Sequence, residues 1–240
     1  MWCGTAGCRD SDMGRNDKMK VLGITGGVGS GKSRVLKLLE EEHGAVVVQL
    51  DEVAKRLQRN GRPCFLRIVE CFGKEVVGAD GELDRAKLGA LVFADGEKLR
   101  MLNAIVHPEV KRWVEEDIAA RREAETAGKR KLDGSTGRPA AVLDDGRREV
   151  SLYVIEAALL PGNGYGQICD EMWYIYAKES VRRERLASSR GYTRERIDQM
   201  MASQPDEAVF CQACRVVIDN GGTFGETRRQ VAGALQEFLM

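Results

Sequence analysis

The stretch "GITGGVGSGKSR", Gly23 to Arg34, contains five glycines, two serines and one lysine in twelve residues. Gly26, four further residues and then Gly31-Lys32-Ser33 match the P-loop pattern, which requires a strand before it and a helix after it. Glycines let the backbone curl until successive amide N–H groups point at one anion, and the N-terminus of the following helix adds partial positive charge. The stretch therefore predicts a phosphate-binding loop.

The sequence on both sides of the loop agrees with this pattern. The apolar run "KVLGIT", residues 20–25, predicts a buried strand, and "KSRVLKLLEEEHG", residues 32–44, has helical spacing and ends on a glycine. The next run, "AVVVQLD", residues 45–51, predicts a second strand with Asp51 at its carboxyl end. Strand, loop, helix and strand form a βαβ unit, so we expect an α/β fold with a parallel sheet.

The rest of the chain divides by pattern. Residues 52–127 are almost wholly helical, with breaks at 61–63, at the turn 78–81 and at His107-Pro108, and they predict a helical insertion. Residues 128–149 predict a polar insertion with a possible hairpin at Asp145-Gly146. Three further strands are predicted by "VSLYVIEA", "EMWYIYA" and "CRVVIDN". Two helical pieces, hinged near Gly191, lie between the second and the third of these strands, and an amphipathic helix ends the chain.

Composition and charge exclude several classes of protein. Lys plus Arg and Asp plus Glu both total 37, so no overall field recruits nucleic acid or a membrane, and we expect neither as a partner. Residues 1–18 lack the apolar core of a signal peptide and predict a polar tail before a kinase domain at 19–240. Seven cysteines, an odd number, favour reduced thiols in the cytoplasm. The Cys211/Cys214 pair has the CxxC spacing of metal and redox sites, but no matching second pair is present, so we interpret the two as buried helix thiols. The oligomeric state is not predicted.

The loop itself supplies the first candidate site residues. Lys32 is expected to reach the β and γ phosphates of ATP, and the Ser33 hydroxyl is expected to bind Mg²⁺. The predicted nucleotide-binding residues of the loop are Gly27, Val28, Gly29, Ser30, Gly31, Lys32, Ser33 and Arg34. A P-loop alone does not separate kinases, GTPases and transport ATPases. No NKxD guanine-binding motif and no LSGGQ-like signature follows in the sequence, which favours a small-molecule kinase.

Polar residues at the ends of the other predicted strands supply further candidates. Asp51 could orient or deprotonate a substrate hydroxyl that attacks the γ phosphate, or it could cap the next helix. Glu156 follows the apolar run "LYVI" and could hold the Mg²⁺ shell through water. Asn220 could bond an adenine edge or serve in a turn. A possible mobile lid carries six arginines, of which two or three could bind phosphate, at 182, 183, 185, 190, 194 and 196.

Taken in order, several motifs resemble the dephospho-CoA kinase family. They are "ITGGVGSGKS", "LDEVAKRL", "CFGKEV…DGELDRAKLGALVF", "LNAIVHPEV", "RRERLASSRGYT" and "VVIDNGG". The resemblance implies a three-layer P-loop kinase core, a CoA-binding subdomain at 52–127 and a lid at 179–205. It also implies phosphorylation of the ribose 3′-hydroxyl of dephospho-CoA by ATP with Mg²⁺. Under it, Asp51, Lys32, Arg185 and Arg190 are catalytic, while Asp51, His107 and Arg85 bind the substrate.

The chain departs from the family pattern at three positions. Gln49 stands where the family usually has an acid, Arg34 where it has Thr, and Gly162 where the PLLxE segment has its final acid. These departures leave two alternatives open. One is another P-loop kinase that acts on nucleosides or nucleotides, and the other is a nucleotide-dependent binding protein with little turnover.

Overall fold

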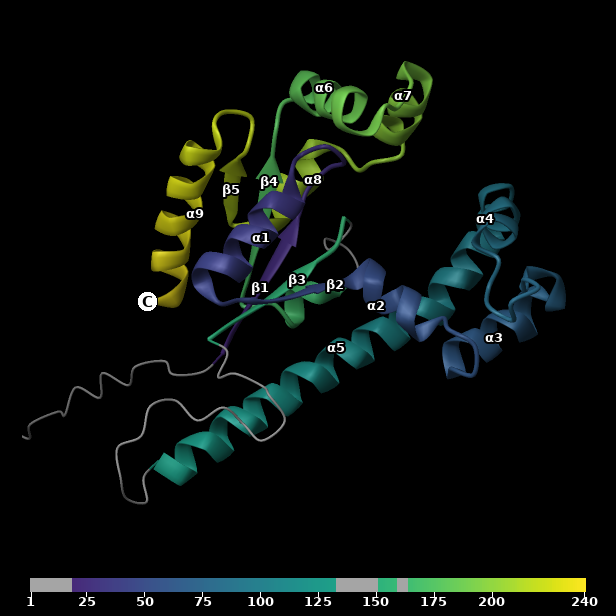
Figure 1. Cartoon of the computed structure of the whole chain (residues 1–240), viewed down its shortest axis with the longest axis horizontal. Coiled ribbons are helices and arrows are strands. Elements are labelled where there is room, and N and C mark those ends of the chain that lie inside the picture. Colours follow the sequence, from purple (N-terminus) through teal and green to yellow (C-terminus); the bar gives the residue numbers. More distant parts are fainter. Residues whose placement is uncertain (1–18, 133–150, 159–163) are drawn as a thin grey trace, which may run out of the picture.

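The computed structural model describes residues 19–132, 151–158 and 164–240, and within them five strands form one parallel sheet. The order across the sheet is β2-β3-β1-β4-β5, so the strand before the P-loop lies in the centre (Figure 1). All four neighbouring pairs are parallel, which places the carboxyl ends of all five strands at one edge. The strands are β1 (Lys20–Thr25), β2 (Val46–Gln49), β3 (Leu152–Glu156), β4 (Glu171–Tyr176) and β5 (Val216–Asp219).

Two helices cover one face of the sheet, α1 (Lys32–His43) and α9 (Phe224–Leu239). Alternate strand residues such as Leu22 and Ile24 point into this layer and are fully buried. The largest fully buried side chain, Trp173, meets Phe238 of α9 edge to face at 6.4 Å. The predicted helix after the P-loop and the predicted C-terminal helix thus form one layer of the core.

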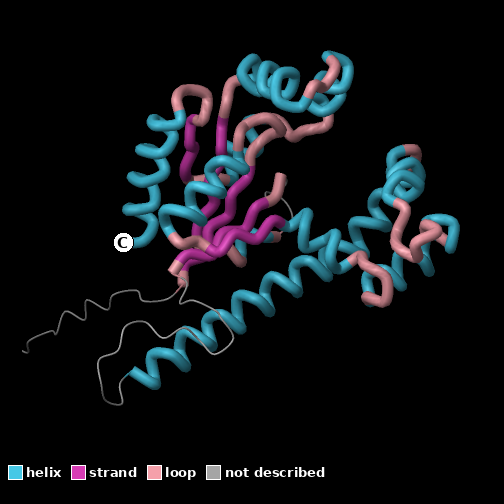
Figure 2. Tube along the Cα trace, viewed as in Figure 1, coloured by secondary structure: helices cyan, strands magenta, loops and turns pink. Residues whose placement is uncertain are grey.

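The other face is covered by the long helix α5 (Gly96–Leu132) and by α8 (Glu207–Ala213) (Figure 2). Val110, Val114 and Ile118 are four residues apart and form a buried stripe on α5 against β1, β2 and β3. Burying one such side chain contributes roughly 1.5–3 kcal/mol. Phe210 of α8 stacks on Tyr174 of β4 at 4.9 Å. The fold is therefore the expected three-layer α/β core. The interpretation of Cys211 and Cys214 as buried helix thiols is confirmed only in part, because Cys211 lies in α8 but is exposed, whereas Cys214 is buried at the C-cap of α8.

The expected helical region after β2 consists of α2 (Leu50–Leu57), α3 (Pro63–Phe72), η1 (Lys74–Val76), α4 (Arg85–Phe93) and α5. The predicted breaks at 61–63 and 78–81 are both present. The predicted break at His107-Pro108 is wrong, because α5 continues through Pro108. Part of α5 packs against α2, α3 and α4, and another part packs against the sheet. The free energy of this packing outweighs the loss of the one hydrogen bond that a proline removes. The helix also extends to Leu132, beyond the expected start of the polar insertion at 128.

The start of α2 corrects a second expectation. The predicted strand 45–51 ends at Gln49, and Leu50 already belongs to α2, so Asp51 is the second residue of a helix. Asp51 is also not the cap, because Gln49 occupies the N-cap position. The side chain of Asp51 nevertheless stays at the carboxyl edge of the sheet, where the chain has just left β2.

The segment predicted to be a lid contains α6 (Glu179–Arg190) and α7 (Arg194–Ala202), which cross above the carboxyl edge of the sheet (Figure 1). Gly191 has the left-handed conformation at φ 61, and Thr193 caps α7 by accepting from the Arg196 amide, as predicted. A short turn of helix, η2 (Tyr165–Gln167), precedes β4. The tail 1–18, the hairpin at Asp145-Gly146 and Gly162 lie outside the described residues. Among the helices of the described segments, none has the length and apolar character to span a membrane.

Candidate active site

The P-loop connects β1 to α1 at the centre of the sheet edge, and its glycines are needed for close approaches. Gly29 and Gly31 have φ angles of 77 and 85, which other residues rarely adopt. A Cβ on Gly26 would lie 2.5 Å from the Ile175 carbonyl oxygen, and a Cβ on Gly31 would overlap the Asn220 amide. The glycine pattern therefore reflects both the turn of the loop and its contact with the strands beside it.

Lys32 is the first residue of α1, and its ammonium group reaches back across the loop. Nζ donates to the Gly26 carbonyl oxygen at 2.7 Å and lies 3.7 Å from Oε1 of Glu156. Burial lowers the pKa of Lys32, while the charges of Glu156 and Asp51 oppose that shift. A partly desolvated cation at a helix N-terminus is suited to binding phosphate oxygens.

Glu156 ends β3 and lies between the two strands that lead into the site. It pairs in register with Ile24 of β1 on one side and with Gln49 of β2 on the other. Burial raises the pKa of Glu156, Lys32 opposes this shift, and the charge of Asp51 adds to it. The sheet order thus brings Lys32, Glu156 and Asp51 into one electrostatic group, as the strand-end argument predicts.

Two lid arginines hold the P-loop by its carbonyl groups. Arg182 donates from Nε to the Val28 carbonyl at 2.8 Å and also bonds to α7 through the Met201 sulfur at 3.0 Å. Arg185 donates to the Asn220 carbonyl at 2.7 Å and to the Ser30 carbonyl at 3.3 Å. Arg182 is one of the six arginines predicted in the lid, but the resemblance to the family assigned it no role. Its spacing of three from Arg185 places both on one face of α6, and that spacing was the available signal.

Arg190 and His107 lie apart from this group. Arg190 is the last residue of α6 and is exposed. His107 is exposed on α5, and no described hydrogen bond or ion pair joins either residue to the P-loop. Arg85, at the first turn of α4, is nearer. Hydrogen bonding and charge from Lys55 lower the pKa of Glu52 in α2, and the charge of Arg85 makes a smaller contribution to this shift.

Asn220 follows β5 and is buried, with its side chain engaged by protein atoms. Its Nδ2 donates to the Ser30 carbonyl at 2.7 Å, and its Oδ1 accepts from the Thr227 hydroxyl at 2.9 Å. The side chain therefore fastens the P-loop to the last strand, which differs from both the adenine contact and the turn considered from the sequence. Thr227, fully buried on α9, completes this link and was missed.

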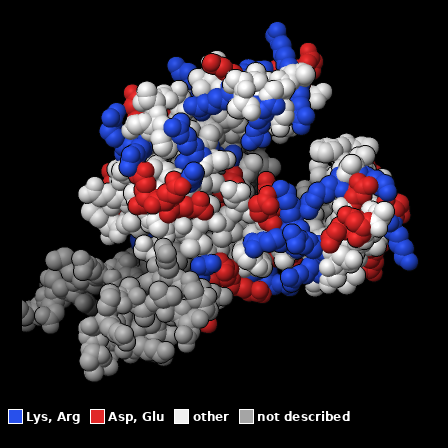
Figure 3. All heavy atoms as spheres, in the orientation of Figure 1, with Lys and Arg blue, Asp and Glu red and all other residues white. Residues whose placement is uncertain are grey.

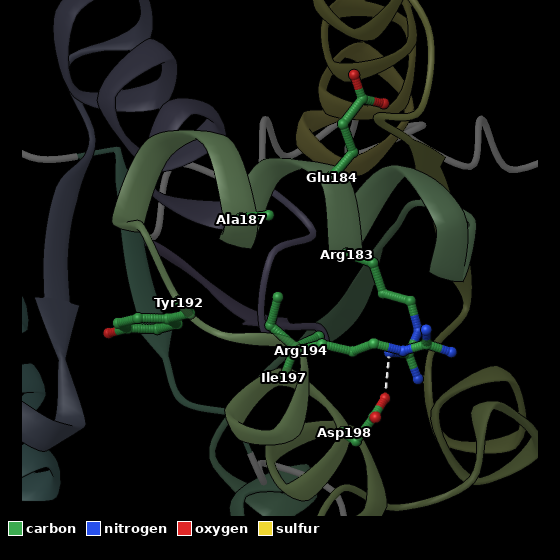
Figure 4. Close-up of a pocket in the computed structure, with 7 residues that line it drawn as sticks. All are labelled: Arg183, Glu184, Ala187, Tyr192, Arg194, Ile197 and Asp198. Atoms are coloured by element: carbon green, nitrogen blue, oxygen red, sulfur yellow. Dashed lines mark hydrogen bonds and ion pairs between the residues drawn. The ribbon is translucent and has the colours of Figure 1, made fainter.

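The surface above the sheet edge is open between the lid and the helical region. Figure 3 shows a hollow there, with Lys and Arg side chains on both of its sides. A separate cavity of ≈ 440 Å³ lies within the lid, between α6 and α7 (Figure 4). Its lining is Arg183, Glu184, Ala187, Tyr192, Arg194, Ile197 and Asp198. Because this lining includes no P-loop residue and neither Asp51 nor Glu156, the cavity is distinct from the charged group.

The oxygen atoms near the P-loop fit a magnesium ion that is bound chiefly by a nucleotide. Ser33 is an exposed second residue of α1, and Glu156 and Asp51 supply carboxylates at the same edge. Within the described segments, no group of three or more His, Cys, Asp or Glu side chains could hold a metal ion. Mg²⁺ commonly takes only one or two protein oxygens and completes its shell with phosphate and water. The residues present therefore fit this mode of binding.

Comparison with known proteins identifies the family. Residues 20–127 match the family model described as dephospho-CoA kinase. The chain is 31% identical to the dephospho-CoA kinase of Carboxydothermus hydrogenoformans over 92% of this chain and 95% of that protein. It is 36% identical to the one from Streptomyces avermitilis over 89% and 91% respectively. The chain belongs to the dephospho-CoA kinase family. The resemblance read from the ordered motifs is thereby confirmed.

Solved structures share the fold of this chain. The crystal structure of TT1252 from Thermus thermophilus superposes with a TM-score of 0.68 at 28% identity and covers 92% of this chain and 98% of its own. Dephospho-CoA kinase from Campylobacter jejuni has the same fold, with a TM-score of 0.55 at 16% identity over 92% of this chain and 97% of its own. The three-layer kinase fold is thus shared over nearly the whole length of this family member.

Proposed function

We propose that this member of the dephospho-CoA kinase family transfers the γ phosphoryl group of ATP to the ribose 3′-hydroxyl of dephospho-CoA. The observation that carries the proposal is the grouping of Lys32, Glu156 and Asp51 at the carboxyl edge of the sheet, beside a complete P-loop. Ligands of open α/β sheets bind at this edge, where strand order reverses. The membership of the family supports the identity of the acceptor.

In the proposed reaction, Asp51 is the general base. Its exposed carboxylate accepts the proton of the ribose hydroxyl while the hydroxyl oxygen forms a bond to the γ phosphorus. The bond between that phosphorus and the bridging oxygen of the β phosphate breaks, and ADP leaves with the electron pair. Phosphoryl transfer requires mainly positioning and charge stabilisation, so a single base beside a phosphate cradle is sufficient.

Positive groups on two sides of the loop stabilise the transferring phosphoryl group in this proposal. Lys32 lies at the base of the loop, and its ammonium group would exchange the Gly26 carbonyl for phosphate oxygens. Arg182 and Arg185 approach from the lid and fix the P-loop carbonyls of Val28 and Ser30. We assign Arg190 a role only when the lid closes, because in this structure it is exposed at the end of α6.

Ser33 and Glu156 are the residues that we propose to hold Mg²⁺, the former directly and the latter through water. When bound, the ion would neutralise charge on the β and γ phosphates. Glu156 also keeps Lys32 in place through their 3.7 Å ion pair. This second task of Glu156 does not depend on the metal.

The parts of the chain divide the work in the proposed enzyme. Residues 52–127 form the acceptor side, with Arg85 and His107 as candidate contacts for dephospho-CoA, and residues 179–205 form the lid. We also propose a cytoplasmic location, supported by the five cysteines of the described residues, all of which are free thiols. No nucleic acid partner is included in the proposal, in line with the balanced charge.

The test is a coupled assay with ATP, Mg²⁺ and dephospho-CoA, with the product analysed by mass spectrometry and ³¹P NMR. We expect a product one phosphoryl group heavier than dephospho-CoA, with a new phosphomonoester at the ribose 3′ position. A panel of nucleosides and nucleotides serves as the matched acceptor control. If the protein phosphorylated one of these compounds and not dephospho-CoA, that compound would be the acceptor instead. If the protein bound ATP and phosphorylated no acceptor, it would be a nucleotide-dependent binding protein.

A further inference from the structure

Arg34 and Phe224 form a contact at the mouth of the P-loop that the proposed mechanism does not use. The guanidinium carbon of Arg34 lies 3.8 Å from the centroid of the Phe224 ring, which places the cation directly over the aromatic face. Phe224 is the first residue of α9 and packs against the core between α1, α9 and the sheet. The ring is therefore a fixed support, while Arg34 itself remains exposed to solvent.

The position of Arg34 is otherwise unfavourable for a cation. It is the third residue of α1, in the first turn, where the partial positive charge of the helix N-terminus repels a positive side chain. Lys32 already brings one positive charge to the same turn. A cation at this unfavourable position, stacked on an aromatic ring, departs from the local rules for helices, and such departures are expected at functional sites.

The strand order decides which substrate this contact can meet. Asp51 and the helical region follow β2 at one edge of the sheet, so the acceptor approaches the central P-loop from that side. The nucleoside part of ATP must then extend toward the opposite side, beyond β4. Phe224 lies on that side, because it follows β5 and the loop that Asn220 fastens to Ser30.

We propose that the guanidinium plane of Arg34, supported by Phe224, is a stacking platform for the purine base of the phosphoryl donor. One face of the planar cation rests on the aromatic ring, and its other face is available to a second π system. A base at Arg34 and phosphates bound at Lys32 would belong to one donor molecule. The proposal rests on the proposed kinase function for the identity of the donor. It assigns Arg34, which the sequence predicted only as a nucleotide-binding residue of the loop, to the base of that nucleotide.

The experiment measures the affinity of the full chain for two donors by calorimetry, ATP and inorganic triphosphate. Arg34→Ala should weaken ATP binding about 3- to 30-fold, the range expected for a cation stacked on a π system. It should leave triphosphate affinity within about 2-fold, since triphosphate has no base. Arg34→Lys keeps the charge and lacks the plane, so it should show the same ATP-specific loss. Lys37→Ala, which removes a positive charge one turn later on α1, is the matched control and should change neither affinity.

Three results would overturn the platform. If Arg34→Ala lost ATP and triphosphate affinity equally, Arg34 would be a phosphate contact. If Arg34→Lys bound ATP as tightly as the unaltered protein, only the charge of Arg34 would matter. If neither affinity changed in Arg34→Ala, Arg34 would be a surface residue without a role in binding. Turnover on dephospho-CoA is recorded with the unaltered protein in parallel. A protein that binds ATP with the predicted Arg34 dependence and does not phosphorylate dephospho-CoA would refute the proposed function and retain the platform. Because alanine is a good helix former, the variants are expected to fold, and a thermal melt checks this.

Discussion

The side chains of Lys32 and Glu156 lie 3.7 Å apart, and both are mostly buried, whereas Asp51 is exposed a few residues beyond β2. The first two therefore depend on each other, because removing one leaves the other as an uncompensated buried charge. Asp51 can be changed without that penalty. This difference makes Asp51 the residue at which chemistry can be separated from stability.

Replacing Asp51 with Asn tests the general base. Asn retains the shape of Asp and removes the carboxylate that accepts the hydroxyl proton, so turnover on dephospho-CoA should fall about 10²- to 10⁴-fold. The dissociation constant for ATP should stay within about a few-fold, because the base acts only in the transition state. Steady-state kinetics and calorimetry give the two values.

Glu52→Gln is the matched control, since it removes a neighbouring exposed carboxylate that pairs with Lys55. It should leave turnover nearly unchanged. If Asp51→Asn retained more than about a tenth of the original rate, the loss would be below the usual range for general-base catalysis, and Asp51 would not be the base.

The raised pKa of Glu156 gives a prediction for stability against pH. The folded protein holds this proton more tightly than the unfolded chain, so the stabilisation is present below the ordinary pKa and is lost as the pH rises through the raised value. Glu156→Gln cannot ionise. Its unfolding free energy relative to the unaltered protein should therefore increase as the pH rises above the ordinary glutamate pKa of 4.5, as measured by urea denaturation.

Glu52 offers a comparison of the opposite sign. Lys55 lowers the pKa of Glu52, so its stabilisation is present above the ordinary pKa and is lost at lower pH. Relative to the unaltered protein, Glu52→Gln should therefore change in the reverse direction only below pH 4.5 and should stay level above it. The change should be small, because the group is exposed and screened. A parallel response of the two variants would contradict the assignment of the buried carboxyl.

At the scale of the elements, Pro108 inside α5 is the main departure from local rules. A proline here cannot donate to the Ala104 carbonyl, and an interior proline costs roughly 3 kcal/mol relative to alanine. Pro108→Ala should therefore raise the unfolding free energy by about 1–2 kcal/mol after the entropy gained by the unfolded chain is deducted. Chemical denaturation measures the change.

Pro205→Ala provides the control, because Pro205 lies in the connection between α7 and α8, where no helical hydrogen bond can be restored. It should be neutral or slightly destabilising. A fall in the stability of Pro108→Ala would mean that the fixed φ angle of the proline, and the shape it gives to α5, matters more than the missing hydrogen bond.

Local elements could be predicted from the sequence where local signals agree. The P-loop, the helix ending at Gly44 and the cap at Thr193 each have their own residues as signals. The continuation of α5 through Pro108 could not be predicted, because it depends on tertiary packing that outweighs propensity. The bounds of α8 could not be predicted, because only Phe210 of its residues is buried, which leaves almost no apolar period.

The candidate site residues at the ends of the strands could be predicted from the sequence, but the contacts that these residues make could not. Parallel strands place Asp51, Glu156 and Asn220 at one edge in any sheet order. The partners of these side chains are not local, since the bond from Asn220 to Ser30 joins residues 190 positions apart. Sequence patterns indicate which residues reach the edge, and only the packed structure shows that Asn220 holds the loop and that Arg182 holds Val28.

At the scale of the whole molecule, the lid should be the least stable part of the described structure. Leu186 and Ile197 are the buried residues of α6 and α7, while the central strands are buried along most of their length. Hydrogen exchange of residues 179–202 should therefore be much faster than that of β1, β3 and β4, and it should slow when ATP binds. Mass spectrometry of peptic fragments measures both rates. Equal protection of lid and sheet without nucleotide would show that the lid is already locked.

The helix α5 is 37 residues, or about 55 Å, long, and it belongs to both the proposed acceptor side and the core. Its middle is fixed to the sheet, where the Tyr153 hydroxyl donates to Asp117 at 2.8 Å and Val114 is fully buried. The geometry of the acceptor side is thus established when the protein folds. Acceptor binding then requires little ordering entropy from the helical region, and its association rate should be set by diffusion and charge rather than by a slow rearrangement.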